Sequence, residues 1–136
     1  EYEEFLGRKV DAGRASMRAD VGHSNDEVEA TSLLGVQPGE PGVRVIWTPE
    51  ALQDRADVWD YIAADNPRAA ARMDELFSDS AARLADYPKL GQPGKIQGTR
   101  ELIPHESYRL VYEISGETVW MLALVHTARQ WPLVRD

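Results

Sequence analysis

The residues that could carry chemistry gather in the last third of the chain. Arg109, in the segment YRLVY, supplies a cation that could stabilise developing negative charge, and Glu101 and His126 supply groups that can exchange protons. Arg100 and Arg129 lie near them in the sequence. Each residue also has a structural interpretation, because partly buried arginines tie strands to helices and a histidine can simply end a strand. The residue types therefore allow an acid–base site without establishing one.

The composition excludes several kinds of site and environment. The 136 residues include no cysteine and three scattered histidines, so we expect no disulfide, no zinc site, no other metal and no cofactor. The apolar runs fall well short of the roughly 20 residues that a membrane-spanning helix needs. Because no export leader is recognised either, we expect a soluble, cytoplasmic protein with no membrane partner.

The net charge of −8 is unevenly distributed along the chain. Residues 1–42 hold nine acidic and four basic residues, residues 43–88 hold nine and five, and residues 89–136 hold five and six. The last third is therefore the part that is not acidic. Proteins that work on RNA usually carry a strongly basic face that neutralises phosphates, and this distribution provides a weak one.

The first 34 residues are predicted to form a helical segment that depends on a partner. Apolar residues of the first part recur near one face of a 3.6-residue period, and Ser24 with Glu27 forms a capping box that should start a second short helix. Two short amphipathic helices bury too little surface to offset the entropy of ordering them, so they should pack on another surface. The residues expected to make that contact are Tyr2, Phe5, Leu6, Val10, Met17 and Val28.

A linker and one domain are predicted to follow this segment. Residues 35–42, GVQPGEPG, have the proline and glycine content of a linker, and residues 43–136 have the length and composition of a single domain. The last predicted strand is apolar on both faces, so it should lie centrally in its sheet. Strands are predicted at residues 43–47, 99–103, 108–114 and 118–126.

Two antiparallel helices are predicted after the first of these strands. Thr48 and Asn66 are favourable capping residues, and each is followed by a proline at the first helical position. The apolar stripe predicted for the first helix consists of Leu52, Ala56, Trp59 and Ala63, widened by Val58 and Ile62. The inner face predicted for the second helix consists of Ala70, Met73, Phe77, Ser80 or Ala81, and Leu84.

Four segments of the domain carry a family resemblance. In chain order they are WTPEALQDRADVWDYIAADNP, AARLADYPKLGQPG, GTRELIPHESYRLVYEI and VHTARQWP. Together they closely resemble the ParE/RelE superfamily of bacterial toxin–antitoxin systems, over nearly all of residues 43–132. The resemblance implies an α+β toxin fold of order β-α-α-β-β-β, in which a helical hairpin packs on a curved antiparallel sheet.

The front segment carries a second resemblance. It contains YEEFLGRKVDAGRASMRADVGHSNDEVEA, which is similar to the PaaA and stability-determinant class of antitoxins that are paired with ParE toxins. The resemblance implies that residues 1–34 are an antitoxin fragment fused to the toxin, and that this fragment is the expected partner. The acidic segment could lay its apolar stripe and its acids over a less acidic toxin surface. It could do so within its own chain, or be exchanged between the two chains of a homodimer.

The superfamily resemblance implies one of two activities. RelE-like members cut ribosome-bound messenger RNA, and Arg109 matches an arginine that they use. The candidates for such a site are Arg109, His126, Arg129, Glu101 and Arg100, with Glu101 and His126 as a substitute pair of the YoeB-like kind. However, the RelE pattern also has a group of lysines before that strand and a terminal tyrosine. Here Lys95 and Trp131 stand nearest to those positions, so the acid–base set is incomplete.

ParE-like members instead bind DNA gyrase and stall it on cleaved DNA, without catalysis by the toxin. We therefore expect a gyrase inhibitor with no catalytic residues. The residues expected to bind the target are Arg129, Gln130, Trp131, Leu133 and Arg135, because exposed tryptophan and arginine often anchor interfaces. Two alternatives stay open: Trp131 could close the core instead, and a toxin fused to its inhibitor could be a silent regulatory module.

Overall fold

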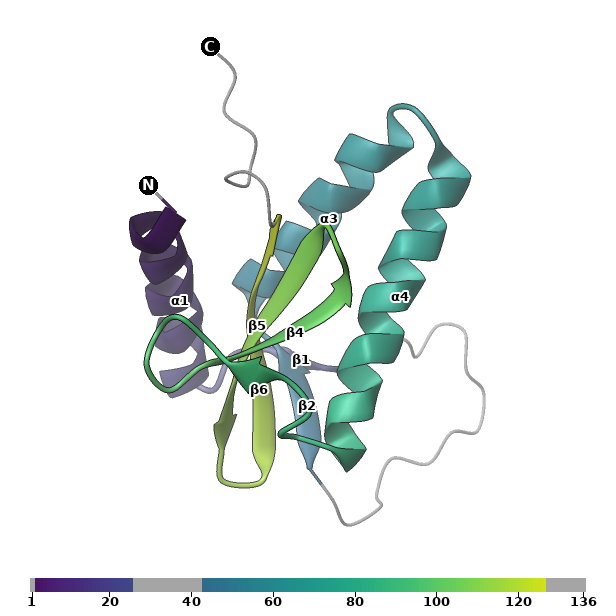
Figure 1. Cartoon of the computed structure of the whole chain (residues 1–136). Coiled ribbons are helices and arrows are strands. Elements are labelled where there is room, and N and C mark those ends of the chain that lie inside the picture. Colours follow the sequence, from purple (N-terminus) through teal and green to yellow (C-terminus); the bar gives the residue numbers. More distant parts are fainter. Residues whose placement is uncertain (1, 26–42, 127–136) are drawn as a thin grey trace.

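The computed structural model describes residues 2–25 and 43–126, which form three helices and one six-stranded sheet (Figure 1). None of the described helices combines the length and the apolar character that crossing a membrane would require. The helices are α1 (Tyr2–Arg18), α3 (Pro49–Ala63) and α4 (Pro67–Asp86). The strands are β1 (His23–Ser24), β2 (Arg44–Trp47), β3 (Gln92–Pro93), β4 (Arg100–His105), β5 (Tyr108–Ser115) and β6 (Thr118–His126).

The sheet has the strand order β1-β2-β6-β5-β4-β3. β6 lies between β2 and β5, in agreement with its predicted central position, and its residues 119–125 are all buried. Neighbouring strands run antiparallel except β2 and β6, which run parallel with Val45 opposite Val119. The sheet is therefore mixed, whereas the sequence predicted an antiparallel one. The difference arises because no tight hairpin joins β2 to β6, so nothing forces them to run in opposite directions.

Helices α3 and α4 begin where the sequence predicts. The side-chain oxygen of Thr48 accepts a hydrogen bond from the N–H of Ala51, and that of Asn66 accepts one from the N–H of Ala69, both at 3.1 Å. A proline follows each cap, at a position where the helix needs no N–H donor. The Thr48 hydroxyl also donates to the carbonyl of Met121 at 3.0 Å, which ties the start of α3 to β6.

The buried face of α4 is the predicted one, but that of α3 is rotated. Trp59, predicted to be buried, is 39% exposed. The buried face of α3 is instead centred on Arg55 and Val58. The Arg55 guanidinium lies 4.7 Å from the ring centre of Trp47 and pairs with Asp74 of α4 at 2.8 Å. A pattern of apolar residues could not reveal this face, because a charged residue with its own partners occupies the middle of it.

Leu84 tests how α4 packs on the sheet. Its side chain is fully buried in the hydrophobic core. Leu84→Ala is expected to lower the free energy of unfolding by about 3 kcal/mol, because the cavity left behind closes only in part. Arg83→Ala, on the exposed side of the same turn, is the matched control and should cost less than about 0.5 kcal/mol. Urea denaturation followed by circular dichroism measures both, and equal small effects would contradict the placement of Leu84.

Helix α1 and the α3–α4 hairpin cover opposite faces of the sheet (Figure 1). Tyr108 of β5 packs its ring against Phe77 of α4, with ring centres 5.5 Å apart. Glu113 of the same strand instead pairs with Arg14 of α1. Because successive strand residues point to opposite faces, the even-numbered residues of β5 face α4 and the odd-numbered ones face α1.

Candidate functional site

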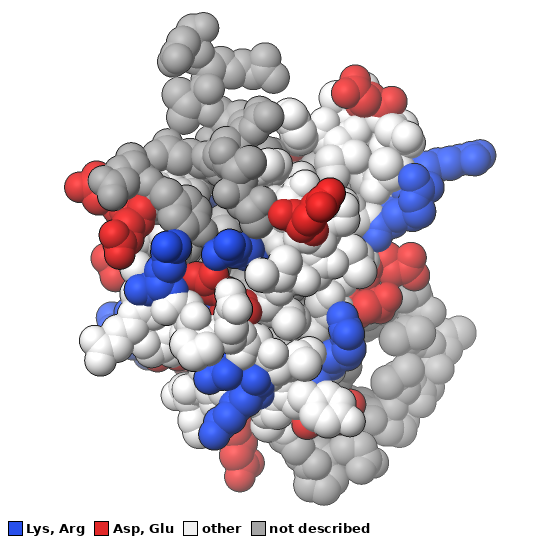
Figure 2. Space-filling view, viewed as in Figure 1, with Lys and Arg blue, Asp and Glu red and all other residues white. Residues whose placement is uncertain are grey.

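Charges of both signs are mixed on the face of the molecule that Figure 2 shows. Figure 2 shows basic side chains separated by acidic and neutral ones on the visible face, without a continuous basic stripe there. A site that binds the backbone of a nucleic acid needs several neighbouring cations. The functional candidates are therefore best located from the contacts of the sheet.

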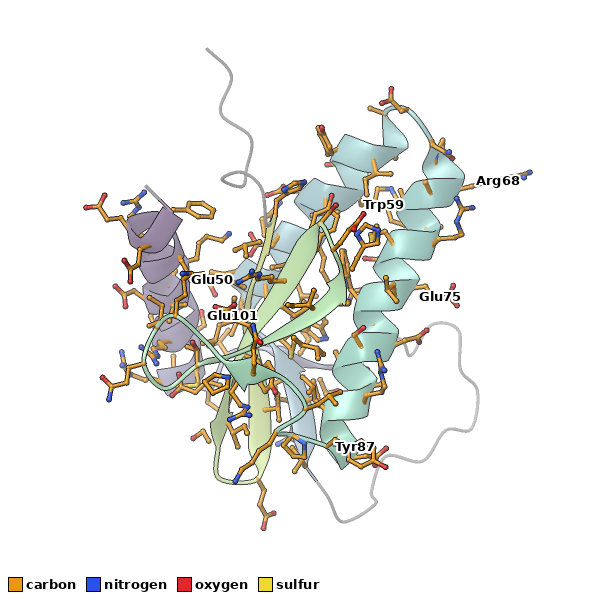
Figure 3. All side chains as sticks on the ribbon, in the orientation of Figure 1. Glu50, Trp59, Arg68, Glu75, Tyr87 and Glu101 are labelled. Atoms are coloured by element: carbon orange, nitrogen blue, oxygen red, sulfur yellow. The ribbon has the colours of Figure 1, made fainter. Side chains whose placement is uncertain are left out.

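The face of the sheet that α1 packs on, termed the α1 face, carries the first group of candidates. Glu101 of β4 lies on it, opposite Val111 of β5, and so does Arg109. Arg109 donates to one carboxylate oxygen of Glu101 at 2.7 Å, and the other oxygen accepts from the N–H of Lys95 at 3.1 Å. Glu101 is 2% exposed and lies over the sheet, while Arg68 and Glu75 of α4 point away from the molecule (Figure 3). The ion pair with Arg109 thus compensates a buried charge.

Arg100 and His126 lie on the opposite face of the sheet. In the register of the strands, Arg100 is opposite Tyr112 and His126 is opposite Tyr108, and both tyrosines face α4. Arg100 donates to a backbone carbonyl just before β3 at 2.6 Å, and the ring of His126 packs against that of Tyr108 with centres 5.1 Å apart. The sheet therefore separates His126 from Glu101, and the acid–base pair considered for these two residues is not formed.

Helix α1 is held on the sheet by apolar side chains and by a close backbone approach. Phe5, Leu6 and Val10 are buried in the same core as β6. Gly13 lies directly over Leu122: a Cβ at this position would stand 2.8 Å from the Leu122 carbonyl oxygen and 2.9 Å from its Cβ. Any other residue would push the helix away from the strand.

Asp54 of α3 joins α1 to the edge of β6. β2 ends at Trp47, so in the described part of the chain β6 beyond Met121 has no strand on that side. There the Asp54 carboxylate accepts a hydrogen bond from the N–H of Leu124 at 3.0 Å and pairs with the ammonium group of Lys9. Burial raises the pKa of Asp54, and Lys9 and the Leu124 N–H oppose that shift. The pKa of Asp54 nevertheless stays above its ordinary value, so Lys9 offsets only part of the free-energy cost of burying this carboxylate.

Polar contacts in the second half of α1 complete its docking. Arg14 donates to the carboxylate of Glu113 and to the carbonyl of Gln97, both at 2.7 Å. The Ser16 hydroxyl donates to the carboxylate of Glu50 at 2.8 Å. The sequence suggested that acids of the front segment would meet a less acidic domain. The described ion pairs of α1 have the opposite polarity, because its basic residues meet acidic residues of the domain.

After α1 the chain adds a short strand to the edge of the sheet. Gly22 lies close to β2, where a Cβ would stand 2.7 Å from the carbonyl oxygen of Trp47. His23 then pairs antiparallel with Trp47, and the side chain of Asn25 accepts a hydrogen bond from the Trp47 indole N–H at 2.9 Å. Residues 2–25 therefore contact one face and one edge of the sheet.

Some predicted site residues lie outside the described part of the chain, as do the predicted second helix and the linker at residues 35–42. Among the predicted contacts of the front segment, Met17 packs partly buried against the core and Tyr2 begins α1. The predicted residues outside the described ranges are Val28, Arg129, Gln130, Trp131, Leu133 and Arg135.

Sequence reasoning missed the polar half of the α1 contact, namely Lys9, Arg14, Asp54 and Glu113. Charged residues on amphipathic helices usually face solvent, so their types carried no signal. Gly13 did carry one. A glycine inside a helical pattern lowers helix stability, but it also indicates a close approach to another backbone, and the structure has that approach here.

Known proteins with related sequences and folds define the class of this chain. A family model described as the ParE toxin of the type II toxin–antitoxin system parDE matches residues 45–131. Putative toxin Y4kP of Sinorhizobium fredii is 39% identical over 92 residues, which are 67% of this chain and 95% of that protein. Toxin RelE2 of Caulobacter vibrioides is 34% identical over 86 residues, 63% of this chain and 97% of that protein. A chain of the chromosomal ParDE system from P. aeruginosa aligns over 57% of this chain and 88% of its own length, with a TM-score of 0.51 and 20% identity.

The chain is thus a toxin of the type II toxin–antitoxin class. Within that class it belongs to the ParE toxin family of the ParE/RelE superfamily. The likeness to the P. aeruginosa structure, at 20% identity, concerns the fold alone. The family match begins at Val45, so α1 and β1 precede it in the sequence.

Proposed function

We propose that the toxin domain, residues 43–136, acts by binding DNA gyrase and does not cut RNA. The observation that carries this proposal is the placement of the candidate catalytic residues. Glu101 and Arg109 pair with each other on the α1 face, whereas Arg100 and His126 lie on the opposite face. A ribonuclease needs a base, a cation and an acid within hydrogen-bond reach of one phosphodiester. Such a set does not converge within residues 2–25 and 43–126.

The occupied arginines of the α1 face support the same proposal. Arg109 is paired with Glu101, and Arg14 is paired with Glu113. An RNA-cleaving site gains affinity from cations that are available to phosphates, and here each of these cations already has a carboxylate partner. The residues proposed to contact gyrase are those of the C-terminal segment: Arg129, Gln130, Trp131, Leu133 and Arg135.

We further propose that residues 1–34 are an antitoxin fragment that masks the toxin domain of the same chain. The family match covers residues 45–131 and so begins after α1, and the relatives named above align over 92 and 86 residues of this chain. Yet α1 buries Phe5, Leu6 and Val10 against the sheet of the toxin fold. A segment outside the family region that packs on the family core is expected of a bound inhibitor. Covalent attachment keeps it at a high effective concentration.

Release of the front segment is expected to switch on gyrase inhibition. A protease site inserted within residues 35–42 would allow the segment to be separated after the whole chain has been purified. After cleavage and dilution, half-maximal inhibition of supercoiling should need at least about tenfold less protein than the uncleaved chain, because the tethered mask is lost. The uncleaved chain treated with inactive protease is the control. Equal potency before and after cleavage would contradict the masking proposal, and no inhibition in either state would contradict the gyrase proposal.

The ribonuclease alternative is tested with translated transcripts and the same cleaved protein. We expect no site-specific cleavage of messenger RNA. Cleavage that Arg109→Ala abolishes would overturn the gyrase proposal, provided that a circular-dichroism melt shows the variant to be folded. Arg109→Lys serves as the control, because it keeps a cation beside the buried Glu101 carboxylate.

A further inference from the structure

We propose that Asp54 and Glu113 select which helix docks on the α1 face, by pairing with two basic residues on either side of a glycine contact. The occupant is α1 itself, through Lys9 and Arg14. This selection rests on the proposed masking role and specifies which helix the toxin domain recognises. The helix is amphipathic and carries six positions in the order basic, apolar, any residue, any residue, glycine, basic. In this chain the pattern is KVDAGR, residues 9–14.

The helix geometry brings each basic residue to a different side of the apolar contact. Successive helix residues are rotated by about 100°, so Lys9 and Arg14 point about 140° apart. Lys9 reaches Asp54 of α3 at the edge of β6. Arg14 reaches Glu113 of β5 on the other side. Because the two acids lie on separate elements, one helix must satisfy both at once, and this fixes its rotation about its own axis.

Asp54 imposes the stricter requirement. Its carboxylate is almost fully buried, and its neighbours in the structure are the Lys9 ammonium group, the Leu124 N–H and, on its own helix, the Asp57 carboxylate. A docked helix with a neutral or acidic residue in place of Lys9 would leave a buried charge without a cation. Selectivity then comes from the penalty on incorrect helices as much as from attraction to the correct one.

Glu113 and the glycine contact add finer discrimination. The side chains of Arg14 and Glu113 are 18% and 20% exposed, so solvent screens this pair more than the one at Asp54. Arg14 gains a second acceptor in the Gln97 carbonyl. At Gly13 a Cβ would stand 2.8 Å from the Leu122 carbonyl oxygen, so a helix with a larger residue there would have to move away from both acids.

A charge exchange between Arg14 and Glu113 in the full chain tests the proposal. Hydrogen–deuterium exchange of the α1 amides measures docking, because undocked α1 amides lose protection. We expect Arg14→Glu and Glu113→Arg to accelerate that exchange about tenfold each, and the double variant to return within about threefold of the unmodified chain. Arg8→Glu, an exposed position on α1, makes the same charge change without facing the domain and should leave exchange unchanged.

The glycines of α1 provide a second, independent comparison. Nothing lies within 4 Å of a Cβ built at Gly7, whereas Gly13 faces the Leu122 backbone. Gly7→Ala should slow the exchange of α1 amides by about fivefold, because alanine favours the helix. Gly13→Ala should accelerate it despite the same gain in helix propensity.

Two results would overturn the selection by charge. One is a pair of single charge variants that exchange as slowly as the unmodified chain, and the other is a double variant that exchanges as fast as the singles. The amides around Phe77 and Leu84 of α4 report whether the domain stays folded. If Glu113→Arg disturbs them, the double variant Arg14→Gln with Glu113→Gln is used in place of the charge exchange. In that variant α1 must dock less tightly than in the unmodified chain. Hydrogen–deuterium exchange of α1 does not depend on gyrase or on toxicity. A failure of the charge selection can therefore be distinguished from a failure of the proposed function.

Discussion

Lys9→Met is expected to detach α1 from the sheet at neutral pH and to leave it docked in acid. The substitution keeps most of the side-chain volume but removes the cation beside the buried Asp54 carboxylate. Removing one partner of a buried ion pair typically costs about 3 to 5 kcal/mol. Undocking of α1 gives Asp54 access to water, so the cost should appear in the docking equilibrium of α1 more than in global unfolding. Hydrogen–deuterium exchange of α1 measures it.

The sign of the pH dependence follows from the pKa of Asp54. Burial holds this pKa above its ordinary value, so the docked state favours the protonated carboxyl group. The contribution of Asp54 to docking is therefore complete below the ordinary carboxyl pKa and is lost as the pH rises through the raised pKa. Without Lys9 the docked pKa rises further. The difference between Lys9→Met and the unmodified chain should accordingly grow as the pH rises and shrink as it falls.

A double variant isolates the charge of Asp54. In Lys9→Met with Asp54→Asn, the amide oxygen can still accept the hydrogen bond from the Leu124 N–H, but no buried carboxylate remains. Docking should recover at neutral pH, and the pH-dependent difference should disappear. A Lys9→Met variant that loses α1 protection equally in acid and at neutral pH would show that the ion pair is not what Lys9 contributes.

Phe5→Asp combined with Val10→Asp is expected to make the chain toxic to its host cell. Both side chains are buried in the shared core, and two carboxylates placed there could not stay ionised without partners. The docking equilibrium should move by more than about a thousandfold, since each buried charge costs several kcal/mol. Viable counts after induced expression measure the outcome. Ala12→Asp with Ala15→Asp places the same two charges on exposed positions of α1 and should stay harmless.

The two pairs of variants also test the alternatives to masking. If the unmodified chain is already as toxic as the Phe5 and Val10 variant, the front segment is a passenger. If the Phe5 and Val10 variant is not toxic although its α1 has detached, the fusion is a silent module. Each result is distinguishable, because exchange of α1 amides reports docking separately from viability.

A homodimer that exchanges α1 between chains stays a proposal. In the structure α1 packs on its own chain, and Ser24 is opposite Ile46 of β2, only a few residues after Val43. Residues 26–42 connect Asn25 to Val43, and 18 steps of chain span at most roughly 65 Å. The connection is therefore long enough for docking within one chain. Light scattering tests exchange directly: an exchanged dimer should fall to a monomer when Phe5 and Val10 are replaced by Asp.

The sequence predicted the elements whose signals are local. Thr48 and Asn66 cap their helices as expected, because capping depends on residues within one turn. The central position of β6 followed from a strand that is apolar on both faces. The inner face of α4, with Phe77 and Leu84, followed from a regular apolar period.

What the sequence could not predict depends on contacts between distant residues. Lys9 and Asp54 are separated by 45 positions, and Arg14 and Glu113 by 99. Nothing local to a charged residue indicates whether its partner is another side chain or water. Glu101 and His126 lie on opposite faces of the sheet because of the strand register. The residue types alone do not reveal that register.

The central position of β6 also sets an order of events during synthesis. The ribosome makes α1 first among the described elements and β6 last. The sheet cannot close around residues 118–126 before they emerge, and until then the surface under α1 does not exist. By that time α1 has already left the ribosome and is attached to the same chain. The part of the chain that matches the toxin family therefore completes its fold with α1 already attached, whereas a helix supplied by a separate chain would first have to arrive by diffusion.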